Sequence, residues 1–285
     1  MEKDYQIQND LTLTLELLRL KEQELAKALS LTPRTLSRWR SGSVYPSLPA
    51  LDNFYSFLYR RGVRLLKSKA QFYQEDLQGE KLLFHGSKKG IDGPLSLSYS
   101  QEGKDFGPGF YCGESLEQSA SFVSLYPHSS LYLVAFKEEG LRVASFGVDQ
   151  EWMLAVAYYR GELEAKKDSP ILQSIIQKVE TADILYAPIA DNRMFAIIGE
   201  FVDGRLSDIQ TLHALSATSL GQQVVFRSEK ALAKVRLLEH CFLSSVEKQD
   251  DLLLRTSLAL EGQQKATIAR IKYQGQGRYI EEILP

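Results

Sequence analysis

Three segments that lie far apart in the sequence carry residue types that can do chemistry. The segment KLLFHGSKKG ends an apolar run in His85, Gly86 and Ser87, which offer an imidazole, an open backbone and a hydroxyl. The segment DFGPGFY ends in Tyr111, and its glycines let a ligand approach the backbone closely. A late apolar run begins with a glutamine pair that includes Gln223. A strand that ends in histidine, glycine and serine indicates a binding site rather than packing alone.

The elements that must position these residues follow from the apolar pattern. After about residue 68 the runs LLF, GFYCG, LYLVAF, ILYAPIA, AIIGEFV and QVVF are typical of strands, and helical patterns lie between them. Before residue 68 the leucines recur at helical spacing. We therefore expect an α+β protein, with an all-α N-terminal bundle followed by strands and helices. Near the C-terminus VEKQDDLLLRTSLALEG predicts a helix, whereas TIARIKYQ and RYIEEIL have strand-like patterns.

The N-terminal bundle has the plan of a helix-turn-helix. Glu22–Ala28 predicts a short helix, Thr32 can cap the next helix, and Pro33 suits that helix's first position. The second helix is expected to present Arg34, Thr35, Ser37, Arg38 and Arg40. Residues 10–61 resemble the Xre/lambda-repressor-like helix-turn-helix family, which implies DNA binding through these residues, strengthened by dimerisation. A basic helical bundle used for dimerisation or partner docking would have the same pattern.

Five elements follow one another in order between residues 80 and 240. They are FHGS at 84–87, DFGPGFY at 105–111, EWMLAVAYYRG at 151–161, APIADNRMF at 187–195 and QVVFRSEKAL at 223–232. This order resembles the ADP-ribosyltransferase fold of the H-Y-E type, the group of diphtheria toxin and the poly-ADP-ribose polymerases. The likeness is greatest to a bacterial branch formerly described as a domain of unknown function. It implies a split β-sheet domain that takes NAD+ as substrate and needs no metal.

The resemblance implies a role for each matched residue. His85 would hold the adenosine-side ribose, and the Gly86 backbone would pair with the nicotinamide amide. Tyr111 would stack on the nicotinamide ring, and Gln223 would bind the nicotinamide-side ribose. Ser87 would brace His85 or the ribose. The implied NAD contacts also include Asp105, Phe106, Gly107, Gly109 and Phe110. His85, Tyr111 and Gln223 form the implied catalytic set.

The third catalytic position departs from the H-Y-E pattern, because it holds glutamine in place of glutamate. A glutamine can orient the ribose, but it stabilises a ribosyl cation less and cannot act as a general base. We therefore expect single transfer of ADP-ribose rather than chain elongation. Gln222 faces the other side of a regular strand, so one of the two glutamines serves. Asp191 and Arg193 would line the acceptor side or the NAD phosphates, or form a salt bridge that braces a loop.

Composition narrows the class of protein. The chain has 285 residues, of which 44% are hydrophobic, with 34 basic and 36 acidic side chains. This balance predicts no partner that is bound through overall charge, so DNA contact must come from a local patch. The two cysteines, Cys112 and Cys241, have no metal-ligand spacing and fit a reducing compartment. The polar N-terminus and the lack of a long apolar run predict a cytoplasmic protein without a membrane segment.

We expect a helix-turn-helix domain at 1–67, a linker helix at 68–79, an ADP-ribosyltransferase-like domain at 80–240 and a C-terminal extension at 241–285. The expected activity is mono-ADP-ribosylation of a nucleic acid or protein with release of nicotinamide. A fusion of this kind suggests the toxin of a toxin–antitoxin or phage-defence locus, with an antitoxin protein and a second copy as further partners. A DNA-binding regulator that senses NAD or ADP-ribose, or an NAD glycohydrolase, are the alternatives. Arginine, a nucleobase, a phosphate end and a small molecule all remain open as acceptors.

Overall fold

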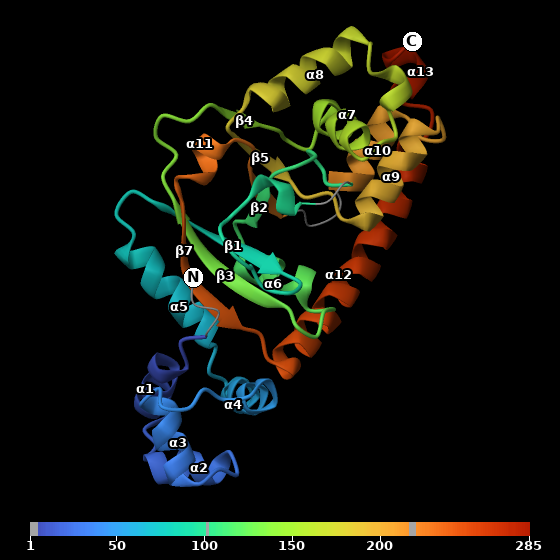
Figure 1. Ribbon diagram of the computed structural model, residues 1–285. Coiled ribbons are helices and arrows are strands. Elements are labelled where there is room, and N and C mark those ends of the chain that lie inside the picture. Colours follow the sequence, from blue (N-terminus) through green and yellow to red (C-terminus); the bar gives the residue numbers. More distant parts are fainter. Residues whose placement is uncertain (1–4, 101–102, 217–220) are drawn as a thin grey trace. The chain divides into compact units, whose positions relative to one another are not determined.

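A computed structural model describes residues 5–100, 103–216 and 221–285 of the chain (Figure 1). The described residues form two compact units, and each draws on three stretches of sequence. Unit 1 comprises Met1–Pro94, Leu116–Ala135 and Arg236–Leu253. Unit 2 comprises Leu95–Ser115, Phe136–Val235 and Leu254–Pro285. The candidate residues are therefore divided, since the FHGS element lies in unit 1 and the DFGPGFY and QVVF elements lie in unit 2.

The N-terminal part of unit 1 is helical, as the leucine spacing predicts. Its helices are α1 Ile7–Leu18, α2 Glu22–Ala28, α3 Pro33–Arg40, α4 Leu48–Arg60 and α5 Leu65–Asp76 (Figure 1). Leu11, Leu25, Leu36 and Phe54 meet in their core and are almost completely buried. The predicted turn is confirmed, because the Thr32 hydroxyl accepts a hydrogen bond from the Thr35 backbone N–H at 3.1 Å.

Unit 1 also contains strand β1 Lys81–Ser87 and all but one residue each of β3 Ser130–Phe136 and β7 Val235–Phe242. These strands follow one another in the order β1-β3-β7. Helix α6 Leu116–Val123 packs against β1, and the Ser119 hydroxyl donates to the Phe84 carbonyl at 3.3 Å. Every residue of β3 is buried, so this strand crosses the middle of the unit.

Unit 2 holds strands β2 Phe110–Gly113, β4 Val143–Ser145, β5 Ile184–Pro188 and β6 Gln222–Phe226, in the order β4-β5-β6-β2. The pair β4–β5 is parallel, and β6 is antiparallel to both β5 and β2. This register sets Gln223 opposite Gly113 on one side and Ala187 on the other.

The helices of unit 2 bury their apolar faces in one large core. They are α7 Gln150–Tyr159, α8 Pro170–Thr181, α9 Asn192–Val202, α10 Asp208–Ser216 and α13 Ile280–Ile283. The short helix α11 Glu229–Leu232 is not part of this core, and 3-10 turns lie at Leu97–Tyr99 and Glu164–Lys166. Helix α12 Ser245–Lys272 begins in unit 1 and continues into unit 2. Helices followed by mixed strands and helices agree with the expected α+β class.

Three strand predictions are wrong. AIIGEFV lies in α9, where Met194, Ile197, Ile198 and Phe201 are buried at helical spacing. TIARIKYQ completes α12, and the central residues of RYIEEIL form α13. Short apolar runs fit either period, and here the burial of one helical face decides between them.

Candidate functional site

The strand end that carries His85 is shaped by helix packing. His85, Gly86 and Ser87 are half-buried at the end of β1, behind the buried Leu83 and Phe84. A Cβ at Gly86 would lie 2.8 Å from the Ser119 carbonyl oxygen, so no larger residue fits against α6. The His85 ring centroid is 6.2 Å from that of Tyr132 on β3. Packing thus accounts for the glycine, and the imidazole stands beside a second aromatic ring.

The DFGPGFY segment forms a tight turn that leads into β2. Gly107 has a φ of 70°, and a Cβ at Gly109 would lie 2.9 Å from the Phe226 carbonyl oxygen. Phe106 and Phe110 are buried, so the turn is anchored by two rings. Both glycines are therefore required by the backbone itself.

Tyr111 folds back over this turn. Its hydroxyl donates to the Gly107 carbonyl at 2.6 Å and accepts from the Phe106 N–H at 3.3 Å. Burial, and then the nearby Asp105 charge, raise the pKa of Tyr111 well above its usual value, so the phenol is neutral. The hydroxyl end of the ring is consequently fixed to the turn, which suits a platform for stacking.

The centre of unit 2 is a buried polar network around Asp105. One carboxylate oxygen of Asp105 accepts from Arg160 at the end of α7, and the Nε contact is 2.9 Å. The other oxygen accepts from the Ala190 N–H at 2.9 Å and from the Gln223 side chain at 2.7 Å. The Gln223 nitrogen also donates to the Pro188 carbonyl at 2.9 Å. Two motif elements that are 118 residues apart in sequence thus meet in one network.

The network settles how the Gln223 carboxamide is turned. Both of its neighbours, the Asp105 carboxylate and the Pro188 carbonyl, accept hydrogen bonds, so the amide nitrogen must face them. Its oxygen then faces away from these two acceptors. Gln223 is buried while Gln222 is exposed, as expected for neighbours on a regular strand.

Sequence reasoning missed the part that Arg160 plays in this network. Arg160 lies in the EWMLAVAYYRG element, and its guanidinium also contacts the Ala190 carbonyl and stands 4.5 Å from the centroid of the Phe195 ring. Trp152, from the same helix, donates to the Pro188 carbonyl at 3.1 Å. The sequence did contain a signal for this ion pair. DFGPGFY has one carboxylate and YYRG has one guanidinium, and each lies among mainly apolar residues.

Asp191 and Arg193 have a local structural role. Asp191 caps α9, with one oxygen accepting from the backbone N–H groups of Arg193 and Met194 at 3.0 Å each. The Arg193 guanidinium pairs back onto the other oxygen at 2.7 Å and remains partly exposed. The structure therefore places this pair at the start of a helix that follows β5.

The helix α3 presents the expected polar residues. Arg34, Ser37 and Arg38 are exposed, while Leu36 and Trp39 on the same helix are buried. Arg40 is also exposed and pairs with Glu22 at 3.1 Å, and the hydroxyl of Thr35 is bonded to that of Thr32 at 2.9 Å. Two arginines and a serine thus form the open polar face of this helix.

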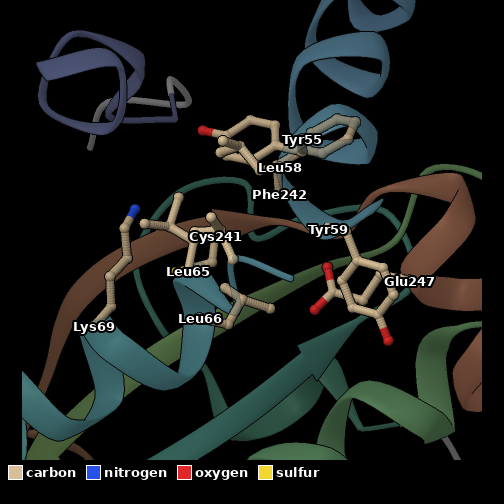
Figure 2. A pocket seen from close by; sticks show the side chains of 10 residues that line it. Tyr55, Leu58, Tyr59, Leu65, Leu66, Lys69, Cys241, Phe242 and Glu247 are labelled. Atoms are coloured by element: carbon tan, nitrogen blue, oxygen red, sulfur yellow. The ribbon is translucent and has the colours of Figure 1, made fainter. Parts of the chain in front are cut away.

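Other features of the described residues add no chemistry. An internal pocket between α4, α5 and β7 has a volume of about 20 Å³, enough for one water molecule (Figure 2). Cys241 lies in its wall, and burial raises the pKa values of Cys241 and Cys112 well above the usual range, which keeps both thiols protonated. The described residues contain no cluster of three His, Cys, Asp or Glu side chains that could hold a metal ion. Across the same residues, every helix is too short or too polar to cross a membrane.

Comparison with known proteins places the chain in a family. A family model with the description "Protein of unknown function (DUF3990)" matches residues 82–237, which is more than half of the chain and includes all five motif elements. No curated protein and no solved structure matches the chain. The matched range begins within β1 and ends within β7. The protein therefore belongs to the family described as "Protein of unknown function (DUF3990)".

Proposed function

We propose that the protein is an NAD-dependent mono-ADP-ribosyltransferase that releases nicotinamide. The observation that carries this proposal is the contact between Asp105 and Gln223. The ADP-ribosyltransferase resemblance assigns both residues to NAD binding from two elements that are distant in sequence. Their meeting in one buried network supports that assignment.

The proposed reaction breaks the bond between C1′ of the nicotinamide-side ribose and the pyridinium nitrogen. The bonding electron pair passes to that nitrogen, so nicotinamide leaves as a neutral molecule and C1′ becomes an oxocarbenium-like cation. A nucleophile of the acceptor then donates an electron pair to C1′ and loses its proton to solvent. Because the leaving group is neutral, the site needs to hold the ribose and tolerate positive charge more than it needs an acid.

Each residue has a defined task in this proposal. Tyr111 offers its clamped ring to the nicotinamide, and Gln223 offers its oxygen to a ribose hydroxyl. His85 binds the adenosine-side ribose, with Gly86 and Ser87 beside it. Asp105 accepts a hydrogen bond from the Gln223 nitrogen and so fixes the direction in which the Gln223 oxygen points.

The helical bundle suggests where the activity acts. The exposed arginines of α3 favour a contact with DNA. We propose that the protein is a toxin that regulates its own operon and has an antitoxin partner. The proposed acceptor is a nucleic acid or a protein.

The activity is tested by incubating the protein with NAD labelled in its ADP-ribose part and with total cell lysate. The label is then separated into protein, RNA, DNA and small-molecule fractions, and free nicotinamide is quantified. We expect a labelled macromolecule and nicotinamide release that His85→Ala and Tyr111→Ala abolish. His213→Ala, a change at an exposed histidine of α10, is the matched control. Absence of nicotinamide release with any lysate refutes the proposal.

One observation favours a second candidate, an NAD- or ADP-ribose-sensing DNA-binding regulator without turnover. The third catalytic position is an uncharged glutamine whose amide nitrogen is already engaged by Asp105 and Pro188. Such a site would bind NAD and leave it intact. Recovery of unaltered NAD after long incubation, together with DNA affinity that changes with NAD, identifies this function. Free ADP-ribose without a labelled macromolecule identifies the glycohydrolase instead.

A further inference from the structure

Unit 1 contains a large cavity that none of the NAD-assigned residues lines. Its volume is about 740 Å³, within the range of small-molecule sites. The helical bundle contributes the residues just before α1 and those at the start of α4. The remaining wall comes from the loop after β1, the loop before β3, and strands β3 and β7. The cavity therefore lies where the bundle meets the strands of the same unit.

Aromatic rings form much of the cavity wall. The rings of Tyr132 and His240 are parallel with centroids 4.4 Å apart, and Tyr5 packs on His240 at 4.2 Å. Tyr45 stands at the rim with 40% of its surface exposed. Rings of this kind accept another flat ring against their faces and edges.

The wall is preformed by hydrogen bonds from two sides. The Tyr132 hydroxyl accepts from the Ile91 backbone N–H at 2.8 Å, and the Tyr45 hydroxyl accepts from the Tyr5 backbone N–H at 2.7 Å. Burial raises the pKa of Tyr5 to about 12 and raises that of Tyr132 as well, so both phenols stay neutral. Neutral phenols and an imidazole offer donors and acceptors around a ring, which suits a heterocycle better than a hydrocarbon.

The charges at the cavity nearly cancel. Lys89 and Asp92 lie three residues apart on the rim, and the Glu239 side chain is engaged by Lys69 and Tyr73. Among the described residues of the lining, Lys89 is the one lysine, and there is no arginine. A phosphate-bearing ligand would need more positive charge than this.

We propose that this cavity binds a neutral planar heterocycle, of the nucleobase or nucleoside class. The proposal goes beyond the transferase function, because it uses none of the residues assigned to NAD. Since the bundle and the strands share the wall, bound ligand stabilises the packing of the helix-turn-helix bundle against the strands of unit 1. Small-molecule occupancy is thereby linked to the part of the protein that presents the α3 arginines.

The test uses the full-length protein and titrates adenosine, guanosine, cytidine and uridine by calorimetry, with ribose and AMP as comparisons. We expect saturable binding of at least one nucleoside, no binding of ribose, and weaker binding of AMP than of adenosine. Tyr45→Ala is expected to weaken the binding about tenfold, in line with the loss of one stacking ring. Leu17→Ala, at an exposed leucine of α1 outside the lining, is the control and should leave the binding unchanged.

Several results overturn the proposal. They are the absence of saturable binding of all four nucleosides, AMP binding at least as tightly as adenosine, and an unchanged affinity in Tyr45→Ala. Circular dichroism verifies that Tyr45→Ala stays folded, and Leu48→Asp on the same rim serves as a second variant. If Tyr111→Ala abolishes nucleoside binding while Tyr45→Ala does not, the nucleoside occupies the NAD site and the cavity assignment fails. Nicotinamide release is measured separately, so failure of the transferase proposal is distinguished from failure of this one.

Discussion

Replacing Gln223 by glutamate is the sharpest test of the Asp105 network. The change would set a carboxyl where the amide nitrogen now lies 2.7 Å from Asp105 and 2.9 Å from the Pro188 carbonyl. If the new group ionised, repulsion at that distance would be about 6 kcal/mol at an effective dielectric constant near 20. Keeping it protonated at pH 7 costs about 4 kcal/mol, because a glutamate ordinarily titrates near 4.3 and each pH unit is worth ~1.4 kcal/mol. Protonation is therefore the less costly response.

This reasoning fixes the sign of the pH dependence. The introduced carboxyl has a folded-state pKa raised above its unfolded value, so the loss of stability is small near the unfolded pKa and grows as pH rises. We expect Gln223→Glu to lower the free energy of unfolding by about 1 kcal/mol at pH 5 and by about 4 kcal/mol at pH 7. The measurement is urea denaturation followed by circular dichroism at both pH values.

A neighbouring residue and a double variant provide controls. Gln222→Glu changes an exposed side chain on the other face of β6 and should stay within about 0.5 kcal/mol of the wild type. Combining Gln223→Glu with Asp105→Asn leaves a single carboxyl group in the network and sets an amide group opposite it. We expect the double variant to be more stable at pH 7 than the sum of the single effects predicts, by about 1–3 kcal/mol. Equal losses for Gln223→Glu at pH 5 and pH 7 would refute the argument.

Four further outcomes are expected. Tyr111→Phe keeps the ring and should retain more nicotinamide release than Tyr111→Ala, which should lose about tenfold or more through the missing stacking surface; equal rates would contradict the platform role. Arg38→Ala should weaken binding to duplex DNA and lower the slope of log affinity against log salt by about one, measured by fluorescence anisotropy, and an unchanged slope counts against a phosphate contact. Lys69→Met leaves Asp10 and Glu239 without their shared partner and should destabilise the protein by about 3–5 kcal/mol in denaturant at pH 7. Hydrogen bonds from the Arg142 backbone and side chain hold the pKa of the Asp183 carboxyl well below its usual value. The ionised carboxyl therefore stabilises the fold above pH 4, and this stabilisation is lost as the pH falls further. Asp183→Asn should be less stable at pH 7, and its urea midpoint should decrease less between pH 4 and lower pH than that of the wild type.

Local sequence signals were reliable where one residue type had one structural meaning. Thr32 and Pro33 marked the start of α3, and the apolar run before His85 formed a strand as expected. The run AIIGEFV was ambiguous, because five apolar residues within seven fit a strand or one face of a helix. The helix is favoured over a strand because Asp191 caps its first turn and because Ile197, Ile198 and Phe201 are buried together in the core.

The contacts between the site residues could not be predicted from the periodicity of the sequence. Nothing in the spacing of DFGPGFY or QVVF says that Asp105 and Gln223 touch, because pairing of distant segments is a property of the whole fold. The family resemblance brought both to attention through their order along the chain. It gave no partner for Arg160, whose role follows only from the geometry of the ion pair with Asp105.

The ammonium group of Lys69 has a practical consequence for anyone who wishes to study the helix-turn-helix alone. It joins Asp10 of α1 to Glu239 of β7, and the Tyr55 hydroxyl adds a further hydrogen bond to Asp10 at 2.5 Å. Severing the gene near codon 67 would separate Asp10 from its lysine, while Lys69 and Glu239 would stay together on the other fragment. Separately expressed halves should therefore be poorly soluble or need co-expression, and intact chains are the sounder starting material for binding studies.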